Sequence, residues 1–333
     1  MEQTDLAFYQ ELLDCMGAPA FLLKDGALLL RSAAAAPAEA ALRVLMEDKL
    51  VQPRAEISHD GWDFSVRPFH GALLVLVSRT EKPEDAMTTA RFLRAPLSDL
   101  FGALSFMFPR LEDLGDPVLM RKAAELNRGL YRLLRTVGNM DLISGEMPTP
   151  RKDRLSLNLF LSRLYEEAEP LCRQAGVSLS LKNAPQPISV FAASQALERA
   201  LLNLLSNAVR FAGTGAKVIL RLRRHQKQAM IEVWNHAGPG SHQEAGNSRM
   251  GQGAGLGLTV VRKLVQVHGG VFLFRPLEDG ACALIALPLD RGSQAVTLRS
   301  PALEIDYAGG FNHLLLEFSD VLPSSAFGPE SVD

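Results

Sequence analysis

The sequence predicts a multidomain α+β protein with a small N-terminal α/β unit, a pair of long helices and a C-terminal α/β domain. Three changes of pattern indicate this fold class. Short apolar runs separated by turn residues fill positions 1–80, a helical apolar period runs through 84–146, and strand-like runs alternate with helices over 153–290. A chain of 333 residues is long enough for two or three domains of about 150 residues each.

The composition is that of an ordinary globular protein, with 47% hydrophobic and 22% charged residues. A formal net charge of −2 gives no general attraction to nucleic acid or anionic membranes. Cys15, Cys172 and Cys282 form no CxxC pair, which argues against a zinc site or disulfide framework and is typical of a reducing cytosol. The chain starts without the basic segment of a signal peptide, and no apolar stretch approaches the roughly 18 residues that span a bilayer. We therefore expect a cytoplasmic protein with no membrane span and no nucleic-acid partner.

Residues 1–80 are expected to form the α/β unit. After an amphipathic start, an extended run over 19–32 is divided by the turn signal Asp25-Gly26. A helical piece around 38–50 and two strand-like runs, WDFSVRPF and ALLVLVS, complete the unit. This order and size resemble a reduced PAS-like sensor domain, and a small α/β dimerisation module is the alternative.

Residues 84–146 are expected to form a helical hairpin. Helix one is predicted over 86–110, kinked by Pro96, and helix two over 117–144, with Asp116 as its N-cap. Each helix carries an apolar stripe, and two helices alone cannot bury two stripes. A homodimeric four-helix bundle is the simplest solution.

A Pro-rich, charged linker leads into the C-terminal domain, 153–290. The expected elements are a helix at 156–175, strands near 177–181 and 188–190, a helix at 194–212, strands at 217–223 and 229–235, a helix at 258–268, and strands at 270–276 and 281–289. The tail, 291–333, contains two strand-like runs around Gly309-Gly310 and is predicted to form a β-hairpin.

A glycine-rich loop, GQGAGLGL over 251–258, precedes the last of these helices. Glycines let the backbone approach a phosphate closely, and a helix N-terminus adds N–H donors. The spacing is not a Rossmann fingerprint, because a polar loop follows the preceding strand, and the Gly-Lys-Ser/Thr of a P-loop does not occur. Taken alone, the run indicates either a phosphate-binding loop or a surface loop.

The asparagines of the helix 194–212 favour phosphate binding. Asn203 and Asn207 lie four residues apart on one face of an otherwise apolar helix. A buried amide without a partner costs about 1–3 kcal/mol, so both side chains need partners. Either an Asn bonds to a neighbouring backbone, or an Asn oxygen ligates a Mg²⁺ that bridges phosphates, with Arg210 supplying positive charge.

These two motifs resemble those of the sensor histidine kinases, within the wider GHKL class of ATP-binding proteins. NLLSNAVRF resembles the N box, and GAGLGLTVVRKLVQVHGG resembles the G2 box and the helix after it. The resemblance covers about 84–290 and implies a Bergerat fold, an α/β sandwich that holds ATP and Mg²⁺ between a helical layer and a lid. It implies that Asn207 ligates Mg²⁺ and that Asn203 lies beside it in the pocket. The other residues implied on the phosphate side are Arg210, Gly253, Gly255, Gly257 and Leu258.

The G1 box departs from the family, which offers D-x-G-x-G with an Asp that accepts from the adenine amino group. This chain reads NHAGPG over 235–240, which keeps Gly238 and Gly240. Counting from Gly238 puts His236 at the Asp position, whereas a one-residue insertion puts Asn235 there. An Asn oxygen can accept from adenine without charge assistance, a loss of about 1 kcal/mol.

The first long helix also departs from the family. It reads ARFLRAPL over 90–97, where the family reads S-H-E-L-R-T-P-L, so Arg91 replaces the phosphoacceptor His and Phe92 the acidic base. A guanidinium stays protonated and offers no lone pair to phosphorus. Since none of the seven histidines falls within the hairpin, phosphorylation of a hairpin histidine is excluded.

Three functions remain open at this level. The preferred one is a dimeric, histidine-kinase-like signalling protein that binds Mg-ATP and has lost autophosphorylation at the usual site. The second is an active kinase that phosphorylates a partner protein in trans, and the third is a non-catalytic dimeric scaffold. The implied partners are a second copy of the chain and a response regulator or partner kinase.

Overall fold

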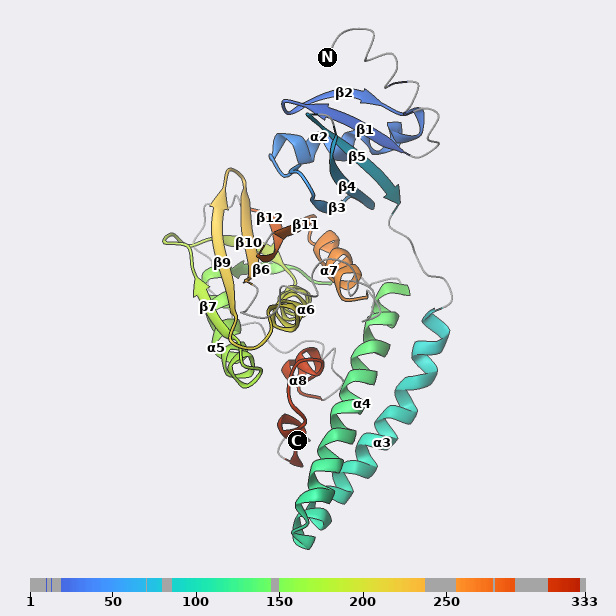
Figure 1. The fold of residues 1–333 in the computed structure, drawn as a ribbon, viewed down its shortest axis with the longest axis vertical. Helices are drawn as coiled ribbons and strands as arrows, with labels where there is room; N and C mark the ends of the chain where they lie inside the picture. The colour runs from blue at the N-terminus through green and yellow to red at the C-terminus, as the bar shows by residue number, and fades with distance from the viewer. Residues whose placement is uncertain are drawn as a thin grey trace.

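The computed structural model of this chain describes residues 10, 13, 19–69, 71–79, 86–144, 150–236, 256–277, 279–290 and 311–329. A ten-stranded sheet with the order β2-β1-β5-β4-β3-β11-β12-β10-β9-β7 runs from the N-terminal unit into the C-terminal domain. A long helical hairpin lies beside the C-terminal domain, and residues 311–329 lie between the two (Figure 1).

The elements described in the N-terminal unit are five strands, a short 3₁₀ turn and the helix α2. Its elements are β1 (Ala20–Lys24), β2 (Ala27–Arg31), the 3₁₀ turn η1 (Ala33–Ala38), α2 (Glu39–Glu47), β3 (Glu56–His59), β4 (Trp62–Phe69) and β5 (Ala72–Arg79). Asp25 and Gly26 have φ angles of 52° and 77°, so the predicted turn is built from two left-handed residues, as a tight hairpin requires. β3 was not predicted from the sequence.

The missed strand β3 joins the N-terminal unit to the C-terminal domain. It pairs with β4 on one side and, antiparallel, with β11 (Val271–Leu277) on the other, where Phe272 lies opposite Ser58. Side chains from both parts also form one buried cluster, which includes Leu42, Phe64, Leu273 and Leu284. The two parts therefore share a sheet and a core.

The helical hairpin consists of α3 (Ala86–Leu114) and α4 (Pro117–Ser144). α3 extends four residues beyond the predicted 110 and contains Pro96 within its span. The predicted N-cap of α4 is confirmed, because Asp116 Oδ1 accepts from the backbone N–H groups of Val118 (2.8 Å) and Leu119 (3.3 Å). No helix in the described part of the chain combines the length and apolarity needed to cross a membrane.

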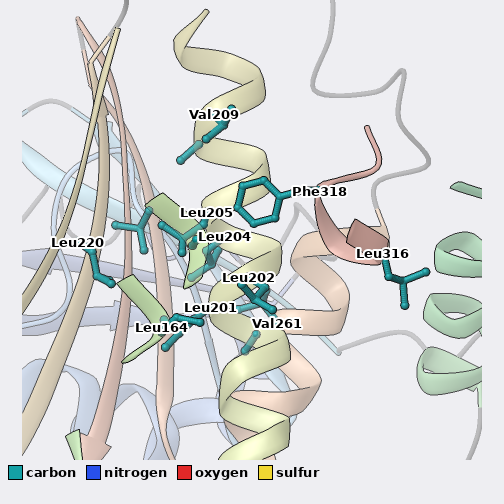
Figure 2. Close-up of a cluster of buried hydrophobic side chains, with 14 of the residues drawn as sticks. Leu164, Leu201, Leu202, Leu204, Leu205, Val209, Leu220, Val261, Leu316 and Phe318 are labelled. Carbon is teal, nitrogen blue, oxygen red and sulfur yellow. The ribbon is translucent and has the colours of Figure 1, made fainter. Parts of the chain in front are cut away.

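The C-terminal domain has the predicted alternation of helices and strands. Its elements are β6 (Asp153–Ser156), α5 (Leu157–Gln174), β7 (Ser178–Lys182), β8 (Ser189–Ala192), α6 (Ser194–Ala212), β9 (Lys217–His225), β10 (Gln228–His236), α7 (Leu256–Val267), β11 and β12 (Gly280–Pro288). β6, which pairs with β8 in a separate two-stranded sheet, was not predicted. Leucines of α6 pack toward the sheet, against side chains such as Leu220, and form the centre of the core (Figure 2).

The tail is helical where the structure describes it, so the predicted second strand of a β-hairpin is wrong. Residues 313–318 form α8 (His313–Phe318), and η3 (Ser324–Phe327) follows. Asn312 starts α8 by accepting from the backbone N–H groups of Leu314 and Leu315 at 3.0 and 3.1 Å. The first predicted strand of the tail and Gly309-Gly310 lie outside the described residues.

Candidate functional site

The candidate site begins with the asparagine pair on α6. This helix is rich in Ala and Leu, good helix formers, and ends where Gly213 takes a left-handed φ of 76°. Asn203 has no exposed surface, and Asn207, one turn later, is half-buried. Both side chains lie on the part of α6 that meets α7, so they stand at a junction of elements rather than on open surface.

Gly257, near the N-terminus of α7, lies directly against this pair. A Cβ atom at Gly257 would lie 2.8 Å from Asn203 Oδ1 and 3.3 Å from Asn207 Nδ2. A side chain there would force a displacement, so glycine permits the close approach. The structure thus brings together two motifs about fifty residues apart, as the resemblance implies. Leu258 packs on the core beside them, and Gly253 and Gly255 lie outside the described residues.

Asn203 already has two side-chain partners. Arg135 Nη2 on α4 donates to Asn203 Oδ1 at 3.2 Å, and Asn203 Nδ2 donates to Glu317 Oε2 on α8 at 2.8 Å. These bonds satisfy both ends of a fully buried amide. Sequence reasoning missed Arg135 and Glu317, because they lie 68 and 114 residues away in the chain and no motif contains them.

Asn207 is held more loosely. Arg210 Nη2 reaches its Oδ1 at 3.5 Å, the outer limit of a hydrogen bond. The Arg210 guanidinium also lies 4.7 Å from the centre of the Phe211 ring, at the exposed end of α6. An amide oxygen with one weak donor is free to bind a cation, and a nearby exposed guanidinium suits an anion.

β10 places the two residues that the sequence left open at the G1 position on opposite faces of the sheet. Neighbouring residues of a strand point to opposite faces, so Asn235 shares a face with Ile231 and Val233, both buried in the core that α6 covers. Asn235 is 6% exposed, whereas His236 is exposed and points to the other face. The structure therefore turns Asn235 toward the helical layer. Gly238 and Gly240 lie outside the described residues.

The hairpin position that the family uses for phosphorylation falls in the first turns of α3. Arg91 belongs to this helix, and its side chain lies outside the described residues. Arg94, three residues on, forms an ion pair with Asp141 of α4, with Nη2 2.8 Å from Oδ2. This ion pair links the two helices next to this position.

Two other features that could be reactive are the buried cysteine thiols and a cluster of possible metal ligands, and the structure gives a simpler explanation for each. Burial raises the pKa of Cys172 and of Cys282 to about 12, so both thiols stay protonated and unreactive. Glu167, Glu198 and His313 place one possible metal ligand each within 4.8 Å of one another. His313 Nε2 lies 2.7 Å from Glu198 Oε1, and Arg163 pairs with Glu167 at 2.8 Å, so contacts with neighbouring side chains account for this cluster.

Comparison with known proteins assigns part of the chain to a family. Residues 192–291 match the family described as histidine kinase-, DNA gyrase B-, and HSP90-like ATPase. The chain is 30% identical over 230 residues to the sensor protein KdpD of Escherichia coli (strain K12), covering 64% of this chain and 25% of KdpD. It is 29% identical over 152 residues to the adaptive-response sensory kinase SasA of Synechococcus sp. (strain CC9902), covering 42% of this chain and 40% of SasA. The chain thus spans less than half the length of either relative.

Solved histidine kinase structures are also similar. Full-length ShkA in complex with AMPPNP has a TM-score of 0.47 and 19% identity, covering 63% of this chain and 46% of ShkA. Histidine kinase ThkA in complex with the response regulator protein TrrA has a TM-score of 0.42 and 15% identity, covering 81% of this chain and 95% of that chain.

Proposed function

Because this chain is a member of the sensor histidine kinase family, with the family's ATPase domain at 192–291, we propose that it binds Mg-ATP between α6 and the N-terminus of α7. The observation that carries the proposal is the approach of Gly257 to Asn203 and Asn207. It places a glycine-bearing helix start, with its N–H donors, against two amide side chains. Those groups fit the phosphates and the magnesium ion of a nucleotide.

Each described side chain has a role in this proposal. Asn207, with its weakly held oxygen, ligates Mg²⁺, and the exposed Arg210 faces phosphate. Asn235, turned toward the helical layer, accepts from the adenine amino group in place of the family's Asp. The remaining proposed binding residues, by resemblance to the family's motifs, are Gly238, Gly240, Gly253, Gly255 and Leu258.

We propose that the output is conformational and dimeric. Arg91 leaves the hairpin without a phosphoacceptor, so the usual autophosphorylation cannot occur. An exposed apolar stripe with seven-residue spacing, the seam of a helical bundle, runs along both hairpin helices. It consists of Leu93, Leu100, Met107 and Leu114 on α3 and Leu119, Leu126 and Leu133 on α4. A second copy covers this seam, and a response regulator or partner kinase receives the signal.

Calorimetric titration with Mg-ATP tests the nucleotide site. The full chain is expected to bind, and Asn207→Ala is expected to weaken binding at least about tenfold, because it removes a metal ligand. Asn183→Ala is the matched control, since Asn183 is an exposed asparagine near α5, outside the site. No heat of binding at millimolar Mg-ATP, or an equal loss in the control, would contradict the proposal.

Phosphorylation of a partner in trans is the second candidate function, favoured by an asparagine–glycine site that lacks an acceptor in its own hairpin. Incubation with labelled ATP and candidate partners separates the two. Label on a partner that disappears with Asn207→Ala would show a kinase, whereas binding of ATP without any transfer supports conformational signalling.

A further inference from the structure

We propose that the strap, residues 311–329, is an autoinhibitory segment whose acidic side chains compete with the nucleotide's phosphates, so that it must leave before Mg-ATP binds tightly. This inference rests on the proposed nucleotide site. The strap lies between α6 and α4, so it touches both the ATPase domain and the hairpin (Figure 1). Phe318 points toward α6 and Leu316 toward α4 (Figure 2).

The strap is built into the fold by a series of contacts along one face of α4. Asn127 Nδ2 donates to the Phe327 carbonyl at 3.0 Å, and Arg128 Nε donates to the Ser319 carbonyl at 3.3 Å. Arg132 Nε, one turn further, pairs with Asp320 Oδ1 at 2.8 Å. Side chains of α4 thus hold both backbone and carboxylate groups of the strap, a specific arrangement rather than a general apolar contact.

Glu317 connects the strap to the candidate site itself. Its carboxylate has no exposed surface and accepts from Arg135 Nε at 3.0 Å and Asn203 Nδ2 at 2.8 Å, with Arg199 Nε at 3.5 Å. A buried carboxylate needs such compensation. While Glu317 is in place, Arg135 and Glu317 occupy both ends of the Asn203 amide, and a negative charge lies beside the residues proposed for the phosphates.

Asp320 also opposes phosphate binding, through its charge interaction with Arg210. Burial raises the pKa of the Asp320 carboxyl, but hydrogen bonding to Arg132 and the charges of neighbouring arginines outweigh burial and hold the pKa below its usual range. Arg210 is among those arginines, so the ionised strap satisfies part of the positive charge proposed to face phosphate. Glu317 therefore contacts Asn203 of the proposed site, and Asp320 interacts through its charge with Arg210, which is proposed to face phosphate.

Release of the strap in the full chain tests this inference. The double variant Glu317→Gln, Asp320→Asn keeps size and shape and removes both negative charges. Amide hydrogen exchange in 311–329 is expected to become at least about tenfold faster, and Mg-ATP affinity to rise at least about tenfold, because a competitor is lost. Reciprocally, saturating Mg-ATP is expected to speed exchange of the wild-type strap. Glu125→Gln, which neutralises an exposed carboxylate paired with Lys122, is the control and should change neither quantity.

The outcomes separate this inference from the proposed function. Faster exchange with unchanged Mg-ATP affinity would overturn autoinhibition and leave the nucleotide site standing. Unchanged exchange would show that the two carboxylates do not hold the strap and would also overturn it. No Mg-ATP binding by either protein would overturn the proposed function and the inhibition together. If the double variant does not fold, Asp320→Asn alone gives the same comparison, since this side chain is partly exposed.

Discussion

The position of Asn235 in the proposed site depends on which face of strand β10 its side chain occupies. The sequence offered His236 by spacing and Asn235 by insertion, and motif counting could not choose between them. The pleat of β10 favours Asn235, because residues on the face of Ile231 and Val233 meet the helices and His236 lies on the other face. Asn203, in contrast, was predicted as a site residue, but its partners Arg135 and Glu317 depend on the packing of distant helices.

Restoring the acidic side chain at Asn235 should strengthen nucleotide binding. Asn235→Asp supplies a charged acceptor for the adenine amino group, so Mg-ATP affinity is expected to rise about fivefold to tenfold, or about 1 kcal/mol. Calorimetric titration measures the change. His236→Asp, exposed on the opposite face, is the control and should leave the affinity unchanged. A gain from His236→Asp alone would show that the choice of residue is wrong.

Among the elements, α6 and the two hairpin helices were predicted well, because apolar periodicity and the N-cap Asp116 are local signals. α8 was not. Its run HLLLEF is too short and too uniformly apolar for periodicity to distinguish a helix from a strand. The cap from Asn312 and the packing against α6 and α4 determine the helix, and packing is not visible in a sequence.

His268 links the end of α7 to the start of α6 and gives this pair of elements a pH dependence. The Ala193 backbone N–H donates to His268 Nε2 at 3.0 Å, and Nδ1 lies 2.7 Å from the Leu264 carbonyl, an arrangement that the neutral ring with a proton on Nδ1 satisfies. Burial lowers the pKa of His268 below its ordinary value of about 6.5, although the carbonyl oxygens of Leu264 and Ala193, which lie next to the ring nitrogens, oppose the shift.

The folded chain is therefore expected to lose stability as pH falls. Because the unfolded His268 protonates first, its contribution is complete above about pH 6.5 and is lost below that value, toward the lower folded pKa. Between pH 7.5 and 5.5 the Tm of the wild type should fall more than that of His268→Gln. Burial also lowers the pKa of His59, so some pH dependence remains in the variant. Equal slopes in the two proteins would contradict this prediction.

At the scale of the whole molecule, the sequence predicted an N-terminal unit, a helical hairpin and a C-terminal domain as three separate parts. In the structure, one ten-stranded sheet includes strands of both the N-terminal unit and the C-terminal domain. The β3–β11 pairing joins residues more than two hundred positions apart. The short strand β3 also lacks the alternation of apolar and polar residues from which a strand is predicted. The PAS-like interpretation of the N-terminal unit stays a prediction. The apolar stripe on each hairpin helix was predicted from periodicity, but which of its side chains stay exposed in one chain is visible only in the structure.

Dimerisation through that seam can be tested directly. Leu100→Glu with Leu126→Glu places charges on two side chains that are 52% and 56% exposed in one chain. If a second copy covers them, burial of these charges is strongly unfavourable, and the mass measured by light scattering should fall from dimer to monomer. Leu159→Glu, on an equally exposed leucine of α5, is the control and should keep the dimer. A wild-type monomer, or a dimer in both variants, would contradict the proposal.

The β3–β11 junction also limits how this protein can be rearranged. A chimaera that exchanges residues 1–80 for another input domain would remove β3 and leave the backbone of β11 as an open sheet edge. Val271 and Leu273, now buried under the N-terminal unit, would be uncovered at the same time. Such an apolar edge is a template for aggregation. The ATPase domain of this chain is therefore a poor donor for modular fusions unless β3 and its turn to β4 travel with it.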